Sequence, residues 1–110
     1  HWARSRRRGP LLPVETVVRK QAHETAALYG LHDRGALVIG KRADINLIDH
    51  DRLRLLKPIM HHDLPAGGPR ILQGAEGYVA TFVNGVQTRD DDQDSGERPG
   101  MLARRQLAVV

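Results

Sequence analysis

The sequence has no cysteine, few aromatic residues and no long apolar run. The lack of cysteine excludes disulfides and thiolate metal sites, and it is typical of a cytoplasmic protein. Aromatic residues make up 4% of the 110 residues, so the chain has few large side chains with which to build a core. No apolar stretch approaches the roughly 18 residues that a membrane-spanning helix needs, and we therefore expect no membrane partner.

The positive charge of the chain is unevenly placed. The formal net charge is +4, with four arginines among the first eight residues (Arg4, Arg6, Arg7 and Arg8) and four aspartates near the end (Asp90, Asp91, Asp92 and Asp94). A basic arm can bind nucleic acid or another anionic partner, so a freestanding binding module is one hypothesis. No RNA-binding aromatic motif accompanies the arginines, and a solvated linker is the interpretation that we favour.

The spacing of apolar residues predicts one amphipathic helix over about 13–29. Residues that recur at steps of three and four share one face, which we interpret as core-facing. They are Val14, Val17, Val18, Ala22, Thr25, Ala26 and Tyr29. Pro13 suits the first turn of a helix, and Gly30 suits its end because glycine adopts the left-handed conformation at little cost.

The segment after the helix, GALVIGKRADINLID at 35–49, predicts two short strands around a corner. We expect strands at 36–39 and 45–49, with Gly35 and Gly40 supplying backbone shapes that a side chain would hinder. Asp44 is expected to accept hydrogen bonds from nearby backbone N–H groups, as aspartate does in turns.

The remainder of the chain predicts one clear hairpin between less regular segments. Residues 52–56 fit either a helical turn or an edge strand, and 61–69 is rich in loop-forming residues. Apolar alternation over 77–83 followed by Asn84-Gly85 indicates a β-hairpin with a type I′ turn and a second arm at 86–88. From about residue 89 the polar sequence predicts a mobile tail.

These segments together resemble the C-terminal region of amidohydrolase-superfamily enzymes, and in particular the N-acyl-D-amino-acid deacylase (D-aminoacylase) branch. The glycine-bracketed turn with Ala43-Asp44 resembles the superfamily in general, whereas the DLPAGG stretch and the following EGY resemble the deacylase branch more specifically. The resembling residues run nearly from end to end, and they are 12–15, 18–20, 28–35, Gly40, 43–44, Asn46, 51–55, 62–68, 75–78, 83–85 and 99–100.

The resemblance implies a longer enzyme with a metal-binding (β/α)8 barrel and a small β-sandwich made from both ends of its chain. Residues 1–34 would be a barrel-end linker and the last barrel helix, and 35–110 the C-terminal part of the sandwich. The fold class expected here is α+β, the helix packing on a partial sandwich. The full-length enzyme would hydrolyse an amide C–N bond of N-acyl-D-amino acids with zinc-activated water. Its zinc ligands, including a His-x-His pair, are absent from this sequence.

Candidate sites within the chain are therefore few. We assign no catalytic residue and no cofactor to it. His61, His62 and Asp63 form a candidate metal site, but a weak one. Adjacent residues on an extended chain point in opposite directions, and a zinc site needs three or four ligands. Gly35, Gly40, Asp44, Asn84 and Gly85 are assigned structural roles. The expected partners are the barrel and the N-terminal strands, and without them exposed strand edges predict self-association.

Overall fold

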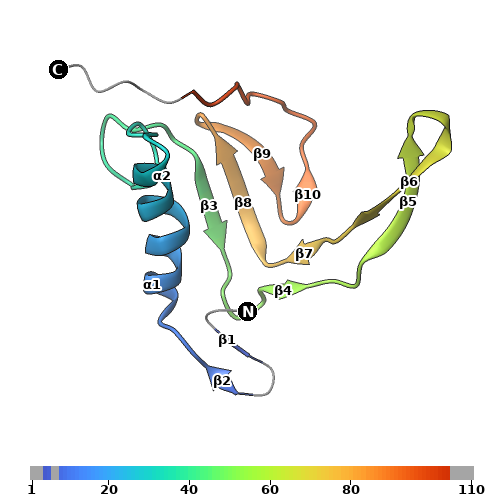
Figure 1. Cartoon of the computed structure of the whole chain (residues 1–110), viewed down its shortest axis with the longest axis horizontal. Coiled ribbons are helices and arrows are strands. Elements are labelled where there is room, and N and C mark those ends of the chain that lie inside the picture. Colours follow the sequence, from blue (N-terminus) through green and yellow to red (C-terminus); the bar gives the residue numbers. More distant parts are fainter. Residues whose placement is uncertain (1–3, 6–7, 105–110) are drawn as a thin grey trace. The chain divides into compact units, whose positions relative to one another are not determined.

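The computed structural model describes residues 4–5 and 8–104, and its contacts divide into two compact units. One unit lies within His1–Ala43 and Met101–Val110, and the other is Asp44–Gly100. The first contains a two-stranded pair, β1 (Arg4–Ser5) with β2 (Gly9–Pro10), and the helical segment. The second contains the strands β3 to β10, which form three sheets (Figure 1).

The helix of the first unit has the extent that the sequence predicted. It runs through α1 (Val14–Val18), a π-helical stretch η1 (Arg19–Glu24) and α2 (Thr25–Leu28). Pro13 precedes it, and the Pro13 carbonyl accepts from the amides of residues 16 and 17. At the other end Gly30 has φ 68°, its amide donates to Ala27 at 3.0 Å, and the Leu31 amide donates to Ala26 at 2.9 Å. This pair of bonds is the Schellman motif, so the predicted glycine stop is confirmed.

The π-helical stretch was not predicted from the sequence. A π turn holds one more residue than an α turn, so it rotates the following residues around the helix axis. The Thr25 hydroxyl donates to the Lys20 carbonyl at 2.8 Å within this stretch. Of the predicted core-facing stripe only Ala26 is buried, while Val18 is 58% and Tyr29 65% exposed. The stripe is thus largely uncovered within this chain.

Gly35 places the loop after the helix directly against the helix backbone. Its φ is +83°, and a Cβ there would lie 2.8 Å from both the Ala22 carbonyl oxygen and the Ala26 Cβ. The Arg42 amide donates to the Asp33 carbonyl at 2.7 Å and closes the loop. The predicted strand at 36–39 is wrong. A strand needs a pairing partner, no described residue supplies one, and Leu37 and Ile39 are 81% and 104% exposed.

The second unit is built on a four-stranded antiparallel sheet with the order β10-β9-β8-β3. Its strands are β3 (Ile45–Ile48), β8 (Tyr78–Val83), β9 (Val86–Asp90) and β10 (Gln93–Asp94). β8 and β9 are joined by the two residues Asn84 and Gly85, whose φ angles of 51° and 79° suit a type I′ turn. Ala80, on the central strand β8, is buried. Regular structure continues to Asp94, beyond residue 89 where we expected the tail to begin.

Two further strand pairs lie outside this sheet. β4 (Arg54–Leu55) pairs with β7 (Ala75–Glu76). Of the two structures predicted for residues 52–56, a helical turn or an edge strand, the strand is therefore the one that forms. β5 (Ile59–Leu64) pairs with β6 (Gly68–Leu72) around a 3₁₀ turn at Pro65–Gly67, so the prediction of a loop-rich 61–69 is wrong. The turn works because Ala66 and Gly67 both adopt positive φ. Pro69 is tolerated because β6 is an edge strand, where one side of the backbone needs no partner.

The architecture is α+β, with one helical segment and a strand-rich unit. No closed barrel forms among the described residues. Their only buried hydrophobic side chains are Ala26 and Ala80. Over the part of the chain that the structure describes, there is no helix with the length and apolar character needed to cross a membrane.

Alanine at Gly35 is expected to destabilise the helical unit more than alanine at Gly40. Both positions have positive φ, which costs an L-residue about 1–2 kcal/mol. Gly40 has open space around it, whereas Gly35 would add an overpacking cost of about 1–3 kcal/mol against the helix. Urea unfolding followed by helical circular dichroism measures both variants. Equal losses of unfolding free energy in the two would contradict the close approach at Gly35.

Candidate functional site

Asp44 joins the start of β3 to the β8–β9 hairpin. Its Oδ1 accepts a hydrogen bond from the backbone amide of Asn84 at 2.8 Å, across 40 residues of sequence. The Asn84 donor belongs to the turn of the hairpin, and the local turn pattern around Asp44 does not indicate it. Nearby, the Thr81 hydroxyl donates to the Asn46 side-chain oxygen at 2.9 Å between paired positions of β8 and β3. Three of the assigned structural residues, Asp44, Asn84 and Gly85, thus meet at one corner of the sheet.

Asp92 fixes the opposite end of β8, and sequence reasoning missed it. Its carboxylate accepts from the amides of Gly77 at 3.1 Å and Tyr78 at 2.8 Å. These two backbone hydrogen bonds hold the pKa of Asp92 below its usual range. Gly77 (φ +102°) also requires glycine, since a Cβ would lie 2.8 Å from the Leu53 backbone. The run of aspartates was interpreted as tail composition, and nothing local indicated a partner 14 residues earlier.

The three weak metal candidates lie on β5, within the β5–β6 hairpin. Both oxygens of Asp63 are engaged by Arg70 of β6, at 2.7 Å from Nε and 2.6 Å from Nη2. This bidentate pair lowers the pKa of Asp63 and raises that of Arg70. His61 is paired with Arg70 across the two strands, and His62 follows His61 on the same extended strand. The described residues contain no group of three or more His, Cys, Asp or Glu side chains that could hold a metal ion.

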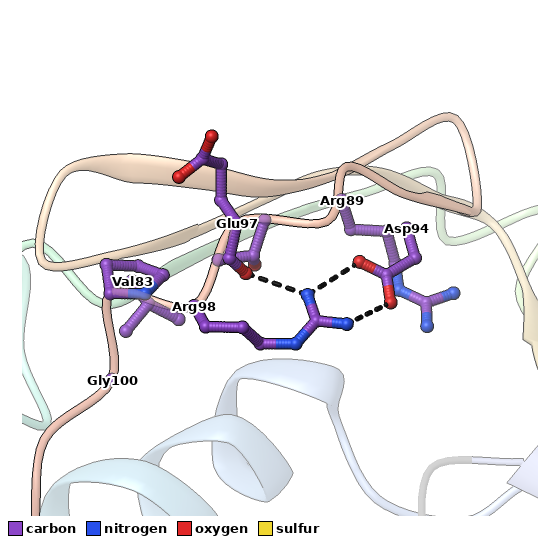
Figure 2. A pocket seen from close by; sticks show the side chains of 8 residues that line it. Val83, Arg89, Asp94, Glu97, Arg98 and Gly100 are labelled. Atoms are coloured by element: carbon purple, nitrogen blue, oxygen red, sulfur yellow. Dashed lines mark hydrogen bonds and ion pairs between the residues drawn. The ribbon is translucent and has the colours of Figure 1, made fainter.

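A shallow surface hollow of about 330 Å³ lies beside β9, β10 and the segment that follows them (Figure 2). Arg98 spans it and donates to both oxygens of Asp94, at 2.9 and 2.8 Å. Arg89, also at the hollow, donates to the Asp92 carbonyl at 2.8 Å. The Arg98 charge is therefore neutralised by Asp94, and the hollow presents this ion pair at the surface.

The arginine-rich segment gives little structural information on a nucleic-acid interface. Arg6 and Arg7 lie outside the described residues. The backbone of Arg4 belongs to β1, and Arg8 is exposed in the turn before β2. The hypothesis of a basic binding module therefore remains a prediction from the sequence.

The Asp94–Arg98 pair should make the end of the sheet sensitive to acid. The hydrogen bond from Arg98, followed by that from the Gly96 amide, lowers the pKa of Asp94 from 3.8 to about 2. A carboxyl whose pKa is lower in the folded state stabilises it fully above its unfolded pKa, and this contribution is lost as the pH falls towards 2. Carbon-13 NMR titration of Asp94 in Arg98→Gln should show a higher pKa, with Arg70→Gln as a control that leaves Asp94 unchanged. An Asp94 midpoint unmoved by Arg98→Gln would contradict this pairing.

Comparison with known proteins identifies the family of this sequence. The family model described as "Amidohydrolase family" matches residues 1–89. An N-acyl-D-aspartate deacylase of Alcaligenes xylosoxydans xylosoxydans is 36% identical over 92 residues, which cover 84% of this chain and 17% of that protein. The chain thus spans less than a fifth of the length of this relative. No solved structure matches it significantly. The chain belongs to the amidohydrolase family, and its sequence is that of a D-aminoacylase-like segment.

Proposed function

We propose that this chain is the C-terminal structural part of a metal-dependent amidohydrolase and carries none of its catalytic residues. Residues 1–34 would form a barrel-end linker and the last helix of a (β/α)8 barrel, the helix being the segment from Val14 to Leu28. The residues from 35 onward would complete a β-sandwich composite domain. The full-length enzyme would hydrolyse the amide C–N bond of N-acyl-D-amino acids, a substrate class suggested by the name of the deacylase relative.

The single observation that carries the proposal is the uncovered apolar surface of both units. In the helical unit Val18, Leu28 and Tyr29 are 58%, 82% and 65% exposed. In the β5–β6 hairpin, whose two strands expose apolar residues along both arms, Ile59 is 60% and Ile71 65% exposed. An isolated two-stranded hairpin is at best marginally stable in water. Exposed apolar surface on this scale is typical of a surface that another part of a protein covers.

The edge strand β3 supports the same conclusion. β3 pairs with β8 on one side, and no described strand pairs on its other side. Leu47 and Ile48 are 56% and 39% exposed. Open edges of this kind accept a further strand, and the N-terminal strands of the full-length enzyme are the partner that we propose.

Zinc would be bound by other parts of the full-length enzyme. When bound, it would lower the pKa of a water molecule and supply the attacking hydroxide. The β5 residues do not fit such a role, because Asp63 is occupied on both oxygens by Arg70 and its neighbours provide too few ligands. The contribution of this chain would be to support the barrel from the helix and the sandwich.

The chain by itself should self-associate through the β3 edge. Size-exclusion chromatography with light scattering is expected to give oligomers whose mass rises with concentration. Leu47→Lys should shift the chain towards monomer, because a lysine on an edge strand opposes strand addition. Met101→Lys is the matched control, since Met101 is 77% exposed but lies outside every strand. A wild-type chain that stays monomeric at high concentration would argue against the proposal that the β3 edge is an open interface.

In the full-length enzyme, His61→Ala and His62→Ala should leave the zinc content and kcat near wild-type values, because neither histidine would bind the metal. Metal analysis of the purified enzyme, followed by steady-state kinetics with an N-acyl-D-amino acid, tests both. Loss of about one zinc per chain in either variant would overturn the assignment of this segment as non-catalytic.

A further inference from the structure

The β8–β9 hairpin turns at Asn84 and Gly85, and both residues are exposed. The side-chain amide of Asn84 makes no hydrogen bond with another described residue. A Cβ at Gly85 would meet nothing within 4 Å, so the space around its backbone is open. The Asn84 amide carbon and the Gly85 backbone nitrogen are therefore adjacent in the chain and unshielded by neighbouring atoms.

We propose that Asn84 is a site of spontaneous deamidation in the folded chain, and that the reaction loosens the corner of the sheet. The Gly85 backbone nitrogen loses its proton and attacks Asn84 Cγ, forming a new N–C bond. The side-chain nitrogen leaves as ammonia, and a five-membered succinimide remains. Water opens this ring at either carbonyl, which gives aspartate or isoaspartate. No oxidant or reductant takes part, and base accelerates the first step by removing the amide proton.

The chain holds its own comparison site, because Asn46 is the only other asparagine. Asn46 lies within β3, where its side-chain oxygen accepts from the Thr81 hydroxyl at 2.9 Å. The next residue is Leu47, whose side chain is bulkier than the hydrogen atom of glycine and whose strand pairing with Ala80 restrains the backbone. At Asn84 the side chain makes no such hydrogen bond, the next residue is glycine, and the turn lies beyond the last paired residues, Val83 and Val86. The structure thus predicts that the two asparagines react at different rates.

The products would act on the bond that Asp44 makes with this turn. The Asn84 amide is the donor to the Asp44 carboxylate at 2.8 Å, so a new carboxylate on residue 84 places a second negative charge beside Asp44. Isoaspartate also routes the main chain through the side-chain carbon and lengthens a loop of only two residues. A type I′ turn depends on the positive φ angles of its two central residues, and the longer linkage removes that geometry.

The reaction is tested by ageing the whole chain at pH 8.5 and 37 °C in its folded state. Trypsin then separates residues 71–89, which contain Asn84, from residues 43–52, which contain Asn46. Fragmentation mass spectrometry assigns the modified residue, and isoaspartyl methyltransferase labelling detects isoaspartate. We expect product at Asn84 to accumulate several-fold faster than at Asn46, with isoaspartate present and the rate rising with pH. Equal rates at the two sites, or an unmodified Asn84, would overturn the proposal.

The consequence for the sheet needs a separate variant. Asn84→Asp reproduces the aspartate product, and it should lower the urea midpoint of unfolding. Asp44→Asn keeps an oxygen acceptor without the charge, so adding it to Asn84→Asp should recover part of the loss. An Asn84→Asp chain as stable as wild type, or no recovery in the double variant, would overturn the link between deamidation and the Asp44 corner.

Discussion

The sheet of this chain depends on two carboxylates that hold the two ends of its central strand. Asp44 binds the turn at the end of β8, and Asp92 binds the residues at its start. β8 is flanked by β3, which lies about thirty residues earlier in the sequence, and by β9, which follows directly. Pairing β3 with β8 closes a long loop, and the entropic cost of loop closure has to be offset by contacts at the ends of the pair. Asp44 supplies a charge-assisted hydrogen bond across this pair, and Asp92 supplies two more between the β9–β10 turn and the start of β8.

Polar contacts hold the strands of this chain together because few apolar side chains are buried. Of the described residues only two hydrophobic side chains are buried, and both are alanines. The chain is poor in aromatic residues, which contribute most area to ordinary cores. Its larger apolar side chains instead lie on the helix, the loop after it and the β5–β6 hairpin, where they are exposed. This distribution is what a segment needs if its role is to contact a larger enzyme, as proposed above.

The predictable parts of the fold were those specified by local chemistry. The helix followed from apolar spacing between Pro13 and Gly30, and the hairpin from Asn84-Gly85, because the few residues at each boundary determine the backbone geometry. The strand at 36–39 was wrong because apolar residues alone do not form a strand without a partner. The β5–β6 hairpin was missed because its turn requires positive φ at Ala66, which alanine rarely adopts. The partner of Arg70 is seven residues away across a hairpin that was not predicted, and those of Asp92 are 14 and 15 residues away, so no local pattern indicates these pairs.

We propose that another part of a longer enzyme covers the apolar surfaces and the strand edge that are open in this chain. Amide hydrogen exchange of β3, compared between this chain alone and the full-length enzyme, tests it most directly. β3 has one open edge among the described strands, so its amides should exchange more slowly in the full-length enzyme, where a further strand would pair with it. The β8–β9 pair, already complete within the chain, should change less. Equal amide exchange rates of β3 in the two proteins would show that no further strand pairs with β3 in the full-length enzyme.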